Sequence, residues 1–415
     1  LVTLPAQLTE RLAAMRLPLG TLGGLPHVAT SAAGFLILAI VVAAGFFGSR
    51  DPVANPLPTL FWSTWWVCFT LLQALVGPLW PHLNPWTAIL ALIGRRGRGP
   101  AAKLPAGIGY LVALLQFAAF AWFELIDPAP SDPERLATAI VFYFGFNLLG
   151  ATVFGERDWM GRAEPFTIFF GLVGRLSPFD RQAAPGGRTT VSLVWPGATL
   201  VARDALPLTG VLFVLMTLAT ASFDGVSRTF AWLGAMGVNP LEFPGRSAVM
   251  GSSTLGLAAA CAALSGLFLA SVFAGAALAG ETRRWGPAAG RLVYSIVPIA
   301  LAFQFSHYLT GVLVDGQNAL IAISDPFGLG WNLFGTGRWH TTTSFLNTLS
   351  GVTAIFNTQT LAIALGHIVG IVMAHAIAIE IFHDPRKAAI SQVPLAVLMV
   401  FYTGFGLWLL STPRI

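Results

Sequence analysis

The stretch that decides the fold is STLGLAAACAALSGLFLASVFAGAALA, residues 253–279, which contains no charged residue. A helix needs ~20 mostly apolar residues to cross the hydrocarbon core of a bilayer. This stretch is long enough for one crossing, and its small residues allow membrane helices to pack closely. It therefore predicts a membrane-spanning helix.

The composition of the whole chain agrees with this prediction. Of 415 residues, 55% are hydrophobic and only 10% are charged, and the mean hydropathy is +0.73. Soluble domains carry about 25% charged residues. The chain also has no cluster of Lys and Arg interleaved with aromatic residues, which argues against nucleic-acid binding. We expect a polytopic integral membrane protein.

Apolar windows predict nine membrane-spanning helices in an all-α helical bundle, which forms a single transmembrane domain over residues 1–415. The predicted spans lie at about 31–48, 58–80, 104–126, 135–154, 206–223, 253–279, 289–313, 358–382 and 392–411.

The distribution of basic residues predicts the orientation of these spans. Lys and Arg collect in cytoplasmic segments of membrane proteins. With nine spans and a cytoplasmic N-terminus, 17 of the 23 Lys and Arg residues fall in cytoplasmic segments. We therefore expect a multi-pass protein of the bacterial inner membrane with its N-terminus in the cytoplasm, in contact with membrane lipid.

Two segments between the spans are apolar but too short to cross. HLNPWTAILALIG, residues 82–94, ends in a basic run and predicts an interfacial helix with Trp86 at the headgroups. Residues 156–181 have a charged beginning, an apolar middle and a charged end. This pattern predicts a segment that either re-enters the membrane or lies flat on its inner face.

Two loops are long. The cytoplasmic loop 155–205 includes the alternating, β-branched stretch 188–204, which predicts a small hairpin. The external loop 314–357 is rich in Gly, Asn, Thr and aromatic residues. Loops of this length in compact proteins are often functional.

Polar residues inside the apolar windows indicate a site. His307 and His367 lie in adjacent predicted spans, roughly 9 and 13 Å below the outer end at 1.5 Å per residue. Their similar depth predicts that they lie close together. Asp224 and Asp315 follow spans five and seven at the same side, and Gln304 shares a helix face with His307. Ionisable residues at membrane depth are usually functional.

Imidazole and carboxylate side chains together suit a divalent metal such as Zn or Fe. The candidate ligands are His307, His367 and, eight residues further along, His375, with Asp224 or Asp315 as ligand or general base. A metal with an open position activates water for hydrolysis. The alternatives are contact with another cofactor and plain hydrogen bonding between helices, which is common in membrane bundles.

Much of the chain from about residue 80 resembles a known bacterial family. The resemblance is carried by LNPWTAI, by ERDWMGRAEPFTIFFGLVGRLSPF, and by VDGQNALIAISDPFGLGWNLFGT, LAIALGHIVGIVMAHAIAIEIFHDPRKAAISQ and VLMVFYTGFGLWLLS. These stretches resemble a family of polytopic membrane proteins, some of whose members are labelled fenitrothion hydrolase. The resemblance implies a histidine at the positions of His307, His367 and His375.

Three functions remain open at this point. The first is a membrane-embedded, metal-dependent hydrolase whose outward-opening site acts on apolar phosphotriesters. The second is a non-enzymatic subunit of a larger membrane complex, which holds lipid, quinone or pigment between its helices. The third is a transporter.

Overall fold

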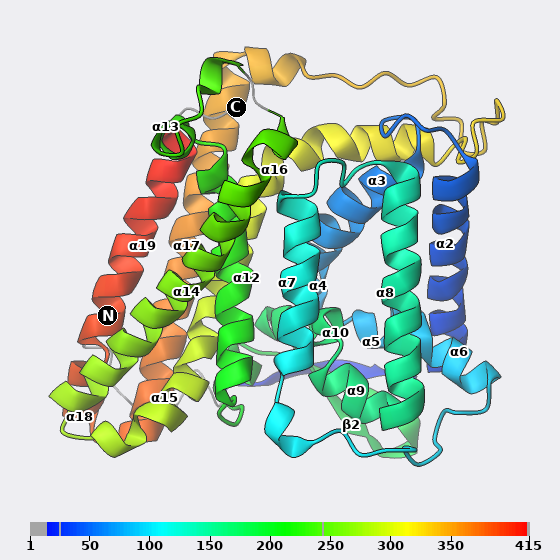
Figure 1. The fold of residues 1–415 in the computed structure, drawn as a ribbon. Coiled ribbons are helices and arrows are strands. Elements are labelled where there is room, and N and C mark those ends of the chain that lie inside the picture. The colour runs from blue at the N-terminus through cyan, green and yellow to red at the C-terminus, as the bar shows by residue number, and fades with distance from the viewer. Residues whose placement is uncertain (1–14, 25, 243–244, 413–415) are drawn as a thin grey trace.

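The computed structural model describes residues 15–412 except 25, 243 and 244. Within these residues eight helices are long and apolar enough to cross a membrane, and they stand side by side in one bundle (Figure 1). This confirms the prediction of a mainly helical, multi-pass membrane protein. The eight are His27–Phe47, Pro56–Val76, Pro133–Phe154, Leu208–Ser227, Arg246–Leu278, Thr282–Ala322, Leu349–Phe382 and Val393–Ser411.

Most of these helices are single elements: α2 (His27–Phe47), α8 (Pro133–Phe154), α12 (Leu208–Ser227), α14 (Arg246–Leu278), α17 (Leu349–Phe382) and α19 (Val393–Ser411). Two are composite. The segment Pro56–Val76 consists of α3 (Pro56–Thr59), the π-helix η1 (Leu60–Phe69) and α4 (Thr70–Val76), and the segment Thr282–Ala322 consists of η6 (Thr282–Arg284), α15 (Trp285–Leu292), η7 (Val293–Ile296) and α16 (Val297–Ala322).

Shorter elements join the long helices. They are α5 (Trp80–Leu83), α6 (Trp86–Leu92), η2 (Ala106–Ile108), α7 (Leu111–Leu125), α9 (Glu156–Arg162), α10 (Pro165–Val173), η3 (Gly174–Leu176), η4 (Pro185–Gly187), α11 (Ala198–Val201), α13 (Phe230–Ala235), η5 (Pro240–Glu242), η8 (Ser344–Asn347) and α18 (Pro385–Ser391). The predicted third span, 104–126, contains α7. With 15 residues, α7 is shorter than the ~20 that a crossing requires.

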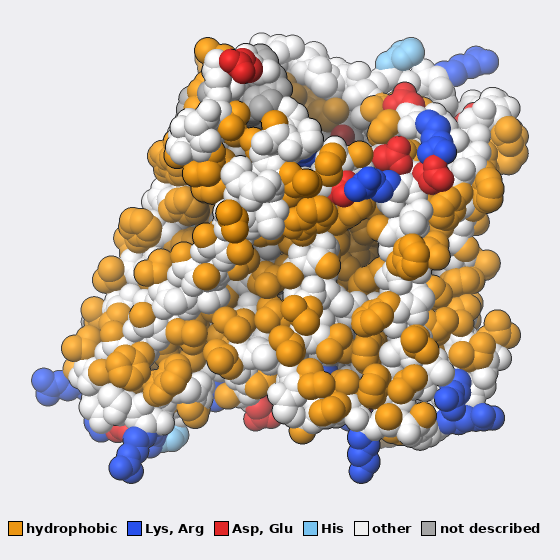
Figure 2. Space-filling model, in the orientation of Figure 1, with side chains coloured by type: hydrophobic (Ala, Val, Ile, Leu, Met, Phe, Trp, Pro, Cys, Tyr) orange, Lys and Arg blue, Asp and Glu red, His pale blue; other side chains and the backbone are white. Residues whose placement is uncertain are grey.

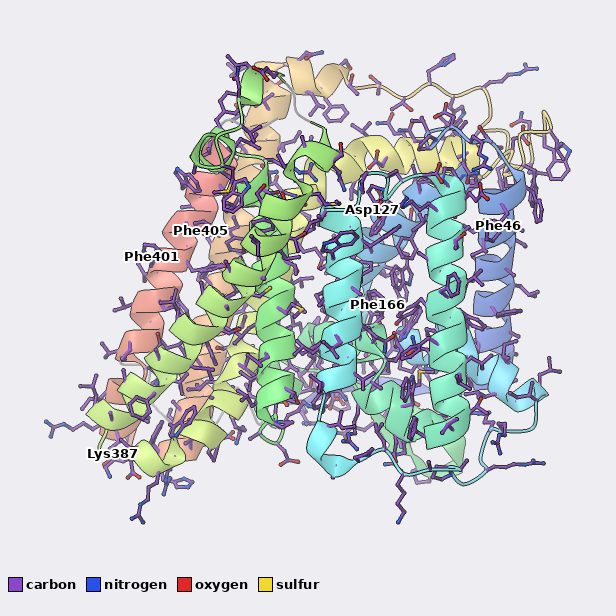
Figure 3. All side chains as sticks on the ribbon, in the orientation of Figure 1. Phe46, Asp127, Phe166, Lys387, Phe401 and Phe405 are labelled. Atoms are coloured by element: carbon purple, nitrogen blue, oxygen red, sulfur yellow. The ribbon has the colours of Figure 1, made fainter. Side chains whose placement is uncertain are left out.

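The surface of the bundle has the pattern expected in lipid. Figure 2 shows hydrophobic side chains across the middle of the visible face and charged side chains at its two ends. Large apolar side chains such as Leu255 and Phe401 are exposed on the surface of the protein. This is the pattern expected where lipid, and not protein, covers the helices. In Figure 3, Lys387 lies at one end and Asp127 near the other, with Phe166 between them.

A small sheet lies at one end of the bundle, which we call the basic face. The sheet consists of β1 (Leu17–Leu22), β2 (Phe179–Ala184) and β3 (Arg188–Leu193), all antiparallel, in the order β1-β3-β2. The hairpin predicted within 188–204 therefore lies earlier, at 179–193, and residues 198–201 are helical. We call the other end, which carries residues 323–348, the opposite face.

Two other loop predictions need correction. Trp86 was predicted at the headgroups, but it is 2% exposed and its ring stacks on Phe144 at a centroid distance of 5.8 Å. The external loop predicted over 314–357 is shorter, because α16 continues to Ala322 and α17 begins at Leu349. In Figure 1 the C-terminal part of α16 runs along the opposite face, across the ends of its neighbours.

The helix α10 is inserted into the bundle instead of lying on its surface. Its Phe166, Phe169 and Phe170 are buried, and Phe170 packs against Trp65 and Trp80 at centroid distances of 5.4 and 5.3 Å. Glu164 caps the helix by accepting hydrogen bonds from the backbone N–H groups of its first turn. The aromatic contacts hold the apolar middle of the predicted segment 156–181 inside the protein.

The π-helix η1 contributes polar groups to the middle of the bundle. π-helical turns leave backbone groups outside the usual α-helical hydrogen bonds and are frequent at functional sites. The carbonyl of Trp66 accepts a hydrogen bond from Gln304 Nε2 at 2.9 Å. This bond joins η1 to α16 in the interior of the bundle.

Candidate functional site

Asp224, near the end of α12, is the centre of a network of polar side chains at the opposite face. The residue is 2% exposed. Its Oδ2 lies 2.6 Å from His307 Nε2 and 3.3 Å from the hydroxyl of Tyr308. Its Oδ1 accepts hydrogen bonds from Arg228, at 3.0 Å from Nε and 2.9 Å from Nη2. A buried carboxylate requires such partners, because its desolvation is costly.

Helix geometry explains why these groups meet. Asp224 and Arg228 are four residues apart, so they lie on the same face at the end of α12. His307 and Tyr308 are consecutive on α16, and their rings meet edge to face at 4.8 Å. Because α16 packs against α12, both side chains reach the same carboxylate.

Tyr308 connects Asp224 to a second carboxyl group. Its hydroxyl oxygen lies 2.7 Å from Oε1 of Glu124, at the end of α7. A tyrosine hydroxyl has one hydrogen to donate. It therefore donates mainly to the nearer group, Glu124, and only weakly to Asp224. A proton on either carboxyl group would give the Tyr308 oxygen a donor of its own, so this arrangement can hold a proton.

Further charged groups fix the same region. Arg246 Nη1 donates to the backbone carbonyls of Glu124 at 2.8 Å and of Asp127 at 3.2 Å. Arg135 forms an ion pair with Asp127 at 2.5 Å. These contacts tie the ends of α7, α8 and α14 together. The side chain of Arg228 is 46% exposed, so its ion pair with Asp224 extends to the surface of the protein.

A small cavity lies beside Glu124 and Tyr308, on the inner side of the network. Its volume is about 10 Å³, and Thr217, Thr220 and Gln304 contribute to its lining. A polar cavity of that size is just large enough for one water molecule. Thr217 and Thr220 precede Asp224 by seven and four residues, so one face of α12 carries polar groups from the cavity to the carboxylate.

The five residues that the sequence singled out do not form one site. Asp224 and His307 are in contact, as predicted. Asp315 is separate from them: its Oδ2 accepts a hydrogen bond from the Ser63 hydroxyl at 2.9 Å. His367 and His375 have other neighbours: His367 Nδ1 lies 2.8 Å from the Ile363 carbonyl, and His375 Nδ1 lies 3.1 Å from Gln392 Nε2.

The predicted similar depth of His307 and His367 does not agree with the structure. Ser306 and Gln359 exchange hydrogen bonds of 2.9 and 2.7 Å, which sets the register of the antiparallel helices α16 and α17. In this register His307 is level with residue 358. His367 is nine residues further along α17, roughly 13 Å nearer the basic face. Close packing of Gly366 against Pro298 and Ala302 agrees with this register.

The residues also do not assemble a metal-binding cluster. In the part of the chain that the structure describes, there is no group of three or more His, Cys, Asp or Glu side chains placed to hold a metal ion. The predicted trio of His307, His367 and His375 is spread along two helices.

Sequence reasoning missed three members of the network: Glu124, Tyr308 and Arg228. Glu124 carried a usable signal, because it is an ionisable residue within the predicted span 104–126. Tyr308 is next to His307 in the sequence. Only the contact between α7 and α16 shows that Tyr308 joins the two carboxyl groups.

No family model, curated protein or solved structure matches this chain. The function therefore has to be argued from the site. Its groups are separated by hydrogen-bond distances and run from a half-exposed arginine to a water-sized cavity. Such a chain can hold a proton and pass it along.

Proposed function

We propose that this protein is a proton-coupled transporter of the bacterial inner membrane, with nine spans and its N-terminus in the cytoplasm. The span that adds to the eight long helices is α7, the third in chain order, which runs between the two faces beside α8 and α12 in Figure 1. Local thinning of the bilayer accommodates a short helix at modest cost. The predicted cytoplasmic segments, which hold 17 of the 23 Lys and Arg residues, then lie on the basic face.

The Tyr308 hydroxyl placed between Glu124 and Asp224, at 2.7 and 3.3 Å, is the observation that carries this proposal. Chains of Asp, Glu and His inside membrane bundles are typical of proton relays in pumps and transporters. Here Arg228 and His307 connect Asp224 toward the opposite face, and Tyr308 connects it inward to Glu124. Protonation of one carboxyl removes a charge from the bundle, and this is the event we propose to be coupled to solute movement.

The proposal is tested by proton flux through the purified protein. Proteoliposomes loaded with a pH-sensitive dye receive a potassium-diffusion potential through valinomycin. The wild type is expected to admit protons faster than empty liposomes. Glu124→Gln keeps the shape of the side chain but cannot ionise. Because a positioned acid–base group typically contributes about 10²–10⁴-fold to a rate, we expect proton flux to fall at least about tenfold.

Glu134→Gln is the matched control. Glu134 lies at the same face but pairs with Arg50 at the surface, and its side chain is 46% exposed. Its loss should leave flux unchanged. Wild-type flux no faster than that of empty liposomes, or equal flux in wild type and Glu124→Gln, overturns the proposal.

A second function is favoured by the short contact between His307 and Asp224. An imidazole held by a carboxylate at 2.6 Å is the arrangement of a general base, which activates water for attack on an ester. This keeps the hydrolase hypothesis for apolar phosphotriesters in a form that needs no metal. Release of the leaving group from a neutral phosphotriester by wild type, and its loss in His307→Gln, would favour it over transport.

A further inference from the structure

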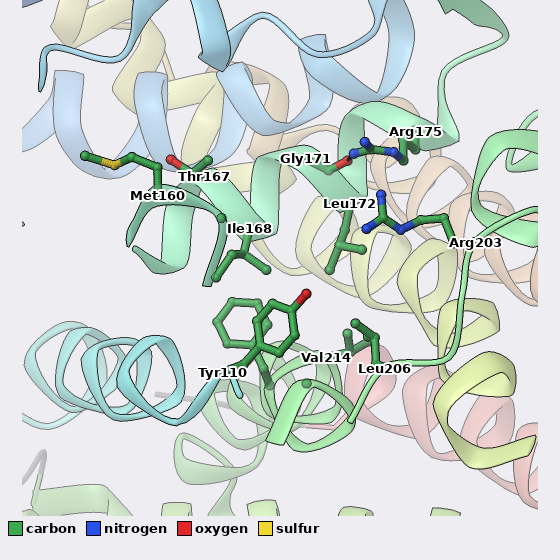
Figure 4. Close-up of a pocket in the computed structure, with 13 residues that line it drawn as sticks. Tyr110, Met160, Thr167, Ile168, Gly171, Leu172, Arg175, Arg203, Leu206 and Val214 are labelled. Atoms are coloured by element: carbon green, nitrogen blue, oxygen red, sulfur yellow. Dashed lines mark hydrogen bonds between the residues drawn. The ribbon is translucent and has the colours of Figure 1, made fainter. Parts of the chain in front are cut away.

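A second cavity lies nearer the basic face, between α10, α12 and the beginning of α7. Its volume is about 180 Å³ (Figure 4). Most of its wall is apolar and includes Met160, Leu172, Phe213 and Val214. Four polar side chains also line it: Tyr110, Thr167, Arg175 and Arg203.

The two arginines have no carboxylate partner among the residues that the structure describes. Among the described residues neither guanidinium takes part in an ion pair, whereas Arg291 near the same face pairs with Glu380 at 2.5 Å. Arg175 Nη1 donates to the backbone carbonyl of Gly171 at 2.6 Å. Arg203 Nε is buried and has no hydrogen-bond acceptor in the described part of the chain.

This arrangement is unfavourable while the cavity holds no anion. Burial lowers the pKa of Arg175, and the charge of Arg203 lowers it further. The charge of Asp180 raises the pKa of Arg175, but Asp180 already forms an ion pair with Arg16. Arginine nonetheless stays protonated in proteins. Two like charges therefore face one partly buried space, and a negative ligand would relieve both the desolvation and the repulsion.

We infer that this cavity binds an oxyanion, specifically a phosphate group carried by a small apolar group. Guanidinium groups bind phosphate through paired, charge-assisted hydrogen bonds. In Figure 4 the hydroxyl of Tyr110 points toward the side where the two guanidiniums lie. A tyrosine hydroxyl is a hydrogen-bond donor, so Tyr110 adds a third donor for the anion.

The size and lining of the cavity define the rest of the ligand. A cavity of ~150 Å³ admits benzene. The 180 Å³ available here, with its apolar wall, therefore fits a phosphate monoester whose organic part is no larger than a phenyl ring. The same chemistry is present in a soluble organic phosphate and in the headgroup of an anionic phospholipid.

The position of the cavity connects it to the carboxylate network. Gly210, Phe213 and Val214 line it, and Thr217 and Asp224 continue the same face of α12 toward the opposite side. If the proposed proton coupling holds, this oxyanion is the transported solute. Binding itself does not depend on that coupling, so it is measured at equilibrium.

The test uses the whole protein in nanodiscs of neutral phosphatidylcholine, titrated with phenyl phosphate in a calorimeter. We expect saturable binding to the wild type. Arg203→Gln removes one charged donor and should weaken the affinity at least about tenfold. Arg203→Lys keeps the charge and should give an intermediate affinity. Arg98→Gln, at an exposed position of the basic face, is the matched control and should bind like the wild type.

Thermal melting of each variant establishes that it is folded before titration. Absence of saturable binding to the wild type, or equal affinity in wild type and folded Arg203→Gln, overturns the inference. Nanodiscs containing phosphatidylglycerol separate the two sources. Competition by this lipid assigns the cavity to a headgroup, and unchanged affinity assigns it to a soluble phosphate. Binding without proton flux would refute the transporter but keep the oxyanion site.

Discussion

Replacing Asp224 with alanine is expected to lower the free energy of unfolding by about 3–5 kcal/mol, the usual cost of removing one member of a buried ion pair. The substitution leaves His307 and Tyr308 without their shared acceptor and Arg228 without its counter-ion. Unfolding in mixed micelles, followed by tryptophan fluorescence as the denaturing detergent is increased, measures the loss.

Asp315→Ala provides the comparison for this experiment. Asp315 is also an aspartate, within α16, and its hydrogen bond in the described part of the chain comes from the hydroxyl of Ser63. We expect its removal to cost about 1 kcal/mol, the value of a single hydrogen bond. Equal losses in the two variants would mean that the network around Asp224 does not stabilise the bundle.

The second large effect is expected at Gly275, where α14 touches the end of α18. A Cβ atom on this residue would lie 1.9 Å from the backbone carbonyl oxygen of Ser391. A backbone atom cannot move aside as a flexible side chain does, so the helices must separate. Gly275→Ala should lower the free energy of unfolding by about 1–3 kcal/mol, as overpacking of a core does. The same micelle titration measures it.

The control lies on the same helix. A Cβ atom at Gly266 meets no neighbouring atom within 4 Å. Alanine there improves helix propensity, so we expect Gly266→Ala to leave stability unchanged or raise it by up to about 1 kcal/mol. A loss at Gly266 as large as that at Gly275 would show that contact between α14 and α18 is not the cause.

The sequence predicted the long apolar helices well because length and hydropathy alone define them. It predicted helix ends poorly. Apolar windows placed the seventh span at 289–313 and the eighth at 358–382, whereas α16 extends to Ala322 and α17 begins at Leu349. Polar residues such as Asp315 and Gln359 lie within these helices. Depths counted from the apolar edges were therefore wrong, and this error brought His307 and His367 together.

The sequence predicts only those residues of the candidate site that stand out within a single segment. His307 and Asp224 were found because each is an ionisable residue in or beside an apolar run. The partnership of Glu124 with Tyr308 joins residues 184 positions apart. The pair of Arg175 and Arg203 likewise depends on how α10 enters the bundle. No spacing in the sequence encodes these contacts, because they arise from the packing of helices.

The sheet at the basic face imposes an order on the synthesis of this protein. β1 pairs only with β3 in the sheet, and Leu17 and Leu193 are partners. At about 5–20 residues per second, β3 leaves the ribosome roughly ten to thirty seconds after β1. During that interval several of the long helices emerge while β1 waits as an unpaired edge. β1 is therefore fastened only after three of the long helices have been made, and a chain interrupted before Arg188 leaves it without its partner strand.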